Sequence, residues 1–392
     1  MIKKIHIITA VLALSSTTIL ANDFKVSGFF NGVISKDNGE YNLREQSKAG
    51  IQIEGKLTPN LSGTMQVVNR ASPISENKRE TSFEYAFLSY KITPQTTLKA
   101  GRLRLPLFML SEYVEVGSIV PWIEAPSSVY QQMPANRYDG VDTSYDFTTE
   151  NADVTIQAFI GNSEADVTLS GLKTVVDLEK VMGTNISIDY EDWSFRIGYA
   201  KSDVAILLGN DTQKELELNL GLLNAGIDSS LKAADYYANS DPSQSLLYQR
   251  TAQGLGAQAG QINALLTYLP DRQKMAILSL GFSGQISDQL SVMGEYVEIN
   301  SNHKLENDDK GHYLAATYDF GLVNTTLTWS QRESLNEFNT KKTNSDQYIA
   351  TVSYDTGSDV IIRAEVNRLD NKINGIKEQT DTKYMISMNY IF

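Results

Sequence analysis

The sequence predicts an all-β fold: a transmembrane, antiparallel β-barrel of about 16 strands. Three observations predict it. Segments of about ten residues alternate between apolar and polar side chains and are separated by turns. Beyond residue 21, no apolar run approaches the roughly 20 residues that a spanning helix needs. Residues 381–392 alternate strictly and end on Phe392, which predicts a last strand that pairs with the first and leaves no open edge.

The N-terminus has the parts of a secretory signal peptide. Lys3 and Lys4 precede an apolar run at residues 5–14, and a short polar stretch leads to a cleavage site after Ala21. We therefore expect residues 1–21 to be a signal peptide and residues 22–392 to form the barrel.

Composition excludes several classes of function. The 392-residue chain has no cysteine, so we expect no disulfide framework and no thiolate metal site. Its formal net charge of −13 argues against a nucleic-acid partner, because phosphate binding requires a basic surface. After the signal segment only His303 and His312 remain, and no serine has the context of a nucleophile elbow. The acidic segment 306–309 lacks the spacing of a calcium loop. We expect no catalytic site, no metal site and no cofactor.

The expected strands are joined alternately by short turns and by longer loops. The first five are residues 24–34, 45–57, 61–70, 82–92 and 96–104. Short turns are expected at residues 58–60, 93–95, 148–151, 191–192, 283–288, 320–322 and 355–358. Both chain ends fall on the short-turn side, as an even number of strands requires.

Two long segments interrupt this alternation of strands, turns and loops. Residues 105–137 contain four prolines, and proline at this density excludes strand pairing. Residues 202–272 instead carry leucines at helical spacing with a break at Asp241-Pro242, which predicts a hairpin of two amphipathic helices in the fifth outer loop. We interpret this helical insert as a lid packed on the barrel rim. A plug, a partner-docking surface and a subunit contact are the alternatives.

The chain resembles the outer-membrane porins of Gram-negative bacteria. The ending Tyr390-Ile-Phe is similar to the closing strand of outer-membrane barrels, and the run from Gly101 to Phe108 (GRLRLPLF), followed later by Pro121-Trp, resembles a group of proteobacterial porin-like proteins and, more remotely, the phosphate-selective porins. The resemblance implies periplasmic short turns, contact with outer-membrane lipid and lipopolysaccharide, a homotrimer, and recognition of Phe392 by the barrel assembly machinery. It also implies that residues 105–137 are an inward-folded third loop that constricts the pore.

If the apolar side of each strand contacts lipid, charged side chains on the other side line water. The expected pore-lining residues are Lys48, Glu54, Arg70, Arg196, Arg363 and Glu365. We expect a bulge near Gly101 to turn Arg102 and Arg104 inward, opposite loop carboxylates. The predicted constriction therefore consists of Arg102, Arg104, Glu112, Glu115, Glu124 and Arg137. Facing charges of this kind order polar solutes and set ion preference.

The implied function is a porin, a water-filled channel for passive diffusion of small hydrophilic solutes and ions. A channel specific for anions or sugars is one alternative, because a binding track would then line the pore. A surface structural or adhesion protein that uses the helical insert is the other, and such a protein would conduct nothing.

Overall fold

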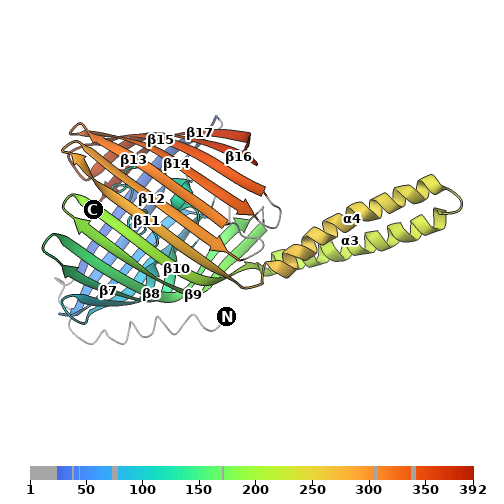
Figure 1. Cartoon of the computed structure of the whole chain (residues 1–392), viewed down its shortest axis with the longest axis horizontal. Helices are drawn as coiled ribbons and strands as arrows, with labels where there is room; N and C mark the ends of the chain where they lie inside the picture. Colours follow the sequence, from blue (N-terminus) through green and yellow to red (C-terminus); the bar gives the residue numbers. More distant parts are fainter. Residues whose placement is uncertain are drawn as a thin grey trace.

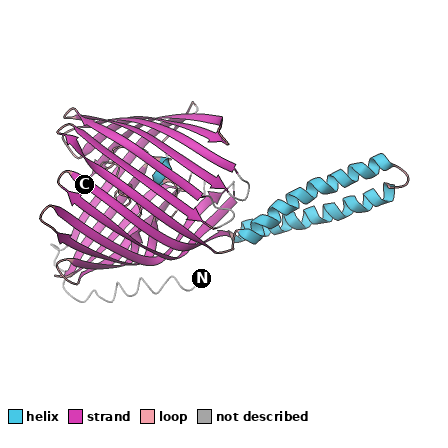
Figure 2. Ribbon diagram, in the orientation of Figure 1, coloured by secondary structure: helices cyan, strands magenta, loops and turns pink. Residues whose placement is uncertain are grey.

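The computed structural model describes residues 24–37, 39–43, 45–72, 78–133, 135–169, 172–302, 308–336 and 341–392. They form one closed sheet from which a long helical hairpin extends (Figure 1, Figure 2). The described sheet has 17 strands, and all of them except the short β2 (Glu40–Asn42) run through the wall. The predicted barrel of about 16 strands is therefore confirmed. The predicted signal peptide, residues 1–21, lies outside the described residues.

The wall strands follow the order of the sequence, and each pairs antiparallel with its neighbours. They are β1 (Phe24–Asp37), β3 (Lys48–Thr58), β4 (Leu61–Ala71), β5 (Arg79–Lys91), β6 (Thr96–Arg104), β7 (Arg137–Thr148), β8 (Ala152–Leu169), β9 (Leu172–Tyr190), β10 (Trp193–Leu208), β11 (Gln273–Ser287), β12 (Leu290–Ser301), β13 (Asp308–Asp319), β14 (Val323–Asn336), β15 (Lys341–Asp355), β16 (Val360–Ile373) and β17 (Ile376–Ile391). Tight connections follow every second strand from β3 to β15, at the positions where the sequence predicts short turns. On the opposite side not every connection is long. Asn374 and Gly375, both at positive φ, join β16 to β17 in a tight turn.

β1 and β17 close the barrel. Phe29 lies opposite Ile391, and the pairing continues to Asp37 opposite Lys383. Gly28 and Phe392 exchange two backbone hydrogen bonds, of 2.9 and 3.0 Å. A Cβ on Gly28 would lie 2.5 Å from Cζ of the Phe392 ring, so only glycine leaves room for the ring there. This seam has the paired edges that a barrel in lipid requires.

The outer surface of the wall is apolar. On β17, Ile386 and Met388 are exposed, whereas Ser387 and Asn389 are buried inside the barrel. Aromatic side chains gather at the tight-turn end of the strands: Tyr90, Tyr145, Tyr190, Phe195, Tyr318, Phe320, Tyr354, Tyr390 and Phe392. An apolar band with an aromatic girdle is the surface that a barrel presents to a bilayer.

The helical hairpin consists of α3 (Asn210–Tyr237) and α4 (Pro242–Tyr268). The Asp241 side chain accepts hydrogen bonds from the first backbone N–H groups of α4 and so caps it. The rings of Tyr237 and Tyr248 stack with their centroids 5.8 Å apart and hold the two helices together. In the part of the chain that the structure describes, no helix is long and apolar enough to cross a membrane.

The hairpin differs from the expected lid in two ways. Its predicted start at residue 202 is wrong, because Val204 and Ile206 still face the buried interior and β10 continues to Leu208. The hairpin also projects beyond the rim instead of covering it (Figure 1). The hairpin joins the barrel at its base, where Gly209 donates to the Lys173 carbonyl oxygen on β9 and Leu269, just after α4, packs with the interior core.

Residues 105–133, 135 and 136 leave the wall after β6 and lie inside the barrel, and they include a short helix, α2 (Ser127–Tyr130). Trp122 is fully buried and donates its indole N–H to Thr328 Oγ1 on β14 at 2.8 Å. Apolar side chains of this loop pack on inward residues of the wall strands, so the hydrophobic core lies within the barrel. Its members include Leu105, Phe108, Val120, Trp122, Val176, Val204, Ile277, Val297 and Tyr313.

Candidate functional site

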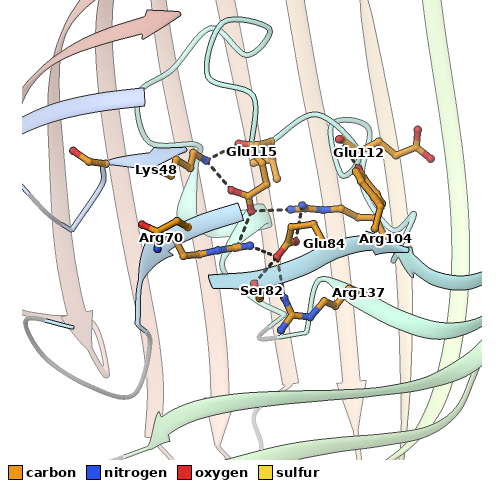
Figure 3. A network of polar contacts seen from close by, with 12 residues as sticks. Lys48, Arg70, Ser82, Glu84, Arg104, Glu112, Glu115 and Arg137 are labelled. Carbon is orange, nitrogen blue, oxygen red and sulfur yellow. Dashed lines mark hydrogen bonds and ion pairs between the residues drawn. The ribbon is translucent and has the colours of Figure 1, made fainter. Parts of the chain in front are cut away.

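A cluster of ion pairs joins the interior loop to the wall (Figure 3). Glu115 of the loop is at its centre. The Glu115 carboxylate lies 2.9 Å from Lys48 Nζ, 3.0 Å from Arg70 Nη1 and 3.1 Å from Arg104 Nη2. Glu115 thus forms ion pairs from the loop to three wall strands, β3, β4 and β6.

Glu84 on β5 is the second carboxylate of the cluster. It is fully buried and pairs with Arg104 at 3.2 Å, with Arg137 at 2.8 Å, and with Arg70. The β4–β5 register skips Glu84 at a bulge. A bulge lets two successive residues point to one side, so Glu84 and Tyr85 both face the lumen. Sequence analysis missed Glu84, although its position next to the outward Phe83 was a signal for an inward side chain.

The cluster carries a surplus of positive charge. Its cations are Lys48, Arg70, Arg104 and Arg137, and its carboxylates are Glu84 and Glu115, which leaves a formal charge of +2. Burial by itself would raise the pKa of the Glu115 carboxyl, but Lys48, Arg104 and Arg70 outweigh burial and hold that pKa well below its usual range. Glu115 therefore stays ionised at neutral pH.

Arg102 does not belong to the cluster. It pairs with Asp139 at 2.8 Å, and the two side chains are 36% and 62% exposed. In register it lies opposite the exposed Ala86, on the outward side. The expectation that a bulge at Gly101 turns Arg102 inward is wrong, because the register irregularity lies in β5 at Glu84. Gly101 instead adopts a positive φ of 135° beside the Ala86 backbone.

The other predicted constriction residues lie apart from the cluster. The Glu112 side chain points away from the ion pairs, on the far side of Arg104 (Figure 3). The Tyr85 hydroxyl donates to the Glu112 carbonyl oxygen at 2.9 Å. Glu124 pairs with Lys383 of β17 at 3.3 Å.

Two of the expected pore-lining charges hold the loop. Arg363 donates to the carbonyl oxygens of Gly117 and Ser118. Glu365 accepts from the backbone N–H of Ile123 at 2.7 Å. These side chains satisfy loop backbone groups that have no strand partner.

Of two further residues that we expected to line the pore, one anchors the interior loop and the other lines a cavity. Arg196 donates to the Pro106 carbonyl oxygen at 2.8 Å and so anchors the start of the loop. Glu54 accepts from Gln52 Nε2 at 2.6 Å and lines a cavity.

Sequence analysis missed one further anchor, Glu295 on β12. This buried carboxylate accepts from the Met109 N–H at 2.8 Å, from the Tyr313 hydroxyl at 2.9 Å and from the Tyr130 hydroxyl. An acidic residue on the inward side of an expected strand was the only signal for it.

Two cavities meet at Arg104. The larger, of about 590 Å³, is lined by Glu54, Tyr85, Lys99, Glu112 and Asp142 among others. The smaller, of about 280 Å³, is lined on the loop side by Glu115, Glu124 and Tyr130. Arg104 lines both, so the cluster stands between them. Within the described residues, no group of three or more His, Asp or Glu side chains could hold a metal ion.

Solved structures similar to this chain are outer-membrane proteins, among them a channel and a porin. The outer-membrane channel DcaP of Acinetobacter baumannii is 11% identical, with 94% of this chain and 97% of that chain covered and a TM-score of 0.58. The anion-selective porin of Comamonas acidovorans is 10% identical, with 94% and 99% covered and a TM-score of 0.57. The trimer form of in-vitro folded OmpT, an outer membrane protein of Vibrio cholerae, is 9% identical, with 94% and 99% covered and a TM-score of 0.55.

At the level of sequence, no protein-family model and no curated protein matches the chain. The structural likeness extends over almost the whole length of each chain, but its low identity speaks only for the fold. The closed wall, its apolar outer band and the similar solved structures all indicate the same fold. The chain has the fold of the outer-membrane porins of Gram-negative bacteria.

Proposed function

We propose that the protein is a porin, a water-filled channel through which small hydrophilic solutes and ions cross the outer membrane by passive diffusion. The ion-pair cluster between loop and wall carries this proposal, because it stands between two cavities inside a closed barrel. Cations and carboxylates that face each other at a narrow aqueous point produce a field that orders polar solutes. Catalysis has no part in the proposal.

The charge surplus of the cluster favours small anions at this point. Lys48, Arg70 and Arg137 are each about a fifth to a quarter exposed, with values of 20%, 21% and 27%, so their charge reaches the lumen. An anion that passes within a Debye length of about 8 Å feels this charge at physiological salt. The similar fold of a porin described as anion-selective supports the same preference.

Planar bilayers test the proposal directly. The purified chain is expected to give stepwise conductance in KCl, and its reversal potential in a salt gradient should show that chloride permeates better than potassium. A folded, inserted protein that conducts nothing would contradict the pore and favour the adhesion alternative. A pore that prefers potassium would contradict the role given to the cluster.

We further propose a homotrimer. The trimer form of OmpT has a similar fold. In this chain, small outward residues lie on neighbouring strands, and a second copy could pack against them: Gly32, Ala49, Gly63, Ala86 and Ala100. Light scattering of the detergent-solubilised protein should give three chains per particle, and a monomer mass would contradict the proposal.

We propose two further partners. Lipopolysaccharide contacts the outer surface of the barrel, and the barrel assembly machinery recognises Phe392.

A further inference from the structure

The larger cavity contains a buried carboxylate that the cluster does not use. Asp142 on β7 is 3% exposed and lines this cavity. Its Oδ2 accepts from Gln157 Nε2 at 2.5 Å and from the Tyr138 hydroxyl at 3.4 Å. Its Oδ1 is buried without a hydrogen-bond partner among the described residues. Such an oxygen is destabilising unless a donor reaches it, so the Asp142 carboxylate keeps an unused acceptor beside the cavity that it lines.

The charges that line this cavity are mainly negative. Glu54, Glu112, Asp142 and Asp359 line it, together with the cations Lys99 and Arg104. Arg104 is already paired with Glu84 and Glu115. Lys99 is the cross-strand neighbour of Asp142, but its Nζ lies over the Phe87 ring, 5.7 Å from the centroid. The cavity therefore attracts positively charged groups, whereas the ion-pair cluster, to which Arg104 belongs, attracts negatively charged groups.

An organic ammonium group fits this lining better than a metal ion. Calcium requires six to eight oxygen ligands close together, and no carboxylate group of that kind occurs among the described residues. An ammonium group needs fewer acceptors and also interacts favourably with aromatic faces. Tyr85, Phe87 and Tyr113 supply such faces in the same cavity.

We propose that this cavity binds a small zwitterionic solute, whose ammonium group pairs with the Asp142 carboxylate and whose carboxylate is directed toward Arg104. Arg104 belongs to the positively charged cluster, so each end of the solute lies near a charge of the opposite sign. The cavity volume of about 590 Å³ lies within the range of small-molecule sites. The inference rests on the proposed pore function, since the pore is the route by which such a solute reaches the cavity.

Calorimetry on the folded, detergent-solubilised chain tests the subsite with three probes of equal carbon number: 4-aminobutanoate, butylamine and butanoate. We expect 4-aminobutanoate to bind more tightly than either singly charged probe. Asp142→Asn should weaken its binding about tenfold, because the negative charge that strengthens the hydrogen bond to the ammonium group is lost. Asp146→Asn is the matched control. Asp146 lies on the same strand, accepts from Thr155 at 2.7 Å, and is not part of the cavity lining, so binding should be unchanged.

Each result of this experiment has a definite meaning. Equal affinity for butylamine and 4-aminobutanoate would overturn the proposal, because the carboxylate would not be recognised. Equal affinity in Asp142→Asn and in the unaltered chain would also overturn it. If Asp142→Asn fails to fold, Glu112→Gln in the loop replaces it, with an expected loss of about threefold, and unchanged affinity there contradicts the subsite. Calorimetry requires no current, so an absence of binding in a conducting protein refutes the subsite and leaves the pore intact.

Discussion

Replacement of Arg104 is the most direct test of the cluster, and Arg102 provides the control. Arg104→Gln removes a buried cation that contacts both Glu84 and Glu115, and it lowers the formal charge of the cluster from +2 to +1. Arg102→Gln, two positions earlier, removes the same charge from an outward pair with Asp139. The two variants have the same net charge and differ only in where the charge is lost.

The size of the effect follows from distance and salt. A unit charge about 8 Å from a passing ion contributes about 0.5 kcal/mol in water, and physiological salt leaves about a third of it. Loss of the charge affects anions and cations in opposite directions. The anion-to-cation permeability ratio of Arg104→Gln should therefore fall about twofold at physiological salt and about fourfold at 0.01 M, where the Debye length is about 30 Å.

Reversal potentials in KCl gradients, measured at both salt concentrations, give this ratio. The free energy of unfolding provides a second measurement. Breaking a buried pair costs about 3–5 kcal/mol, and Arg104→Gln should lie toward the lower end because Glu84 and Glu115 keep Arg70 as a partner. Arg102→Gln should change the free energy of unfolding by at most about 1 kcal/mol, since its pair is exposed. Unchanged selectivity in a folded Arg104→Gln, or an equal shift in both variants, would refute the reasoning.

Four further changes test other parts of the structure. Trp122→Ala should lower the free energy of unfolding by about 3–5 kcal/mol, measured in urea, because it leaves a cavity under the loop and an unpaired Thr328; a stable variant would show that the loop is not held there. Gly28→Val should reduce the fraction of heat-resistant barrel in membranes, because its side chain would meet the Phe392 ring, whereas Gly63→Val, with 3.5 Å to Leu88, should assemble normally. The lowered pKa of Glu115 means that its contribution to stability is complete above the unfolded pKa of about 4.3 and is lost as pH falls through the still lower folded value. Glu115→Gln should therefore shift the reversal potential equally at pH 7 and pH 5, and a shift that disappears at pH 5 would contradict the ion pairs. Protease applied to intact cells should cut within α3–α4 and leave the barrel, and protection in intact cells with cleavage only from the periplasmic side would invert the topology.

The sequence by itself determined the wall of this protein. A strand with one face in lipid must alternate with period two, and the pattern at residues 381–392 carries that signal within a single strand. The tight turns are equally local, because they depend on a few residues such as Thr58-Pro-Asn. The helical hairpin was visible for the same reason, since a period of 3.6 residues is a property of neighbouring positions. Its projection away from the rim is not local, and the sequence interpretation missed it.

The tertiary structure alone decided the site. One bulged residue reverses the direction of every side chain that follows it, and this is why Tyr85 and Phe87 line the lumen cavity while Phe83 faces out. The loop is held by partners far away in the chain: Trp122 and Thr328 are 206 positions apart, and Ile123 and Glu365 are 242 apart. No periodic pattern in a single sequence records such pairs. They exist because a closed barrel brings β14 and β16 to face a loop that leaves β6, so the inward charges meet carbonyl and N–H groups of the loop instead of open water.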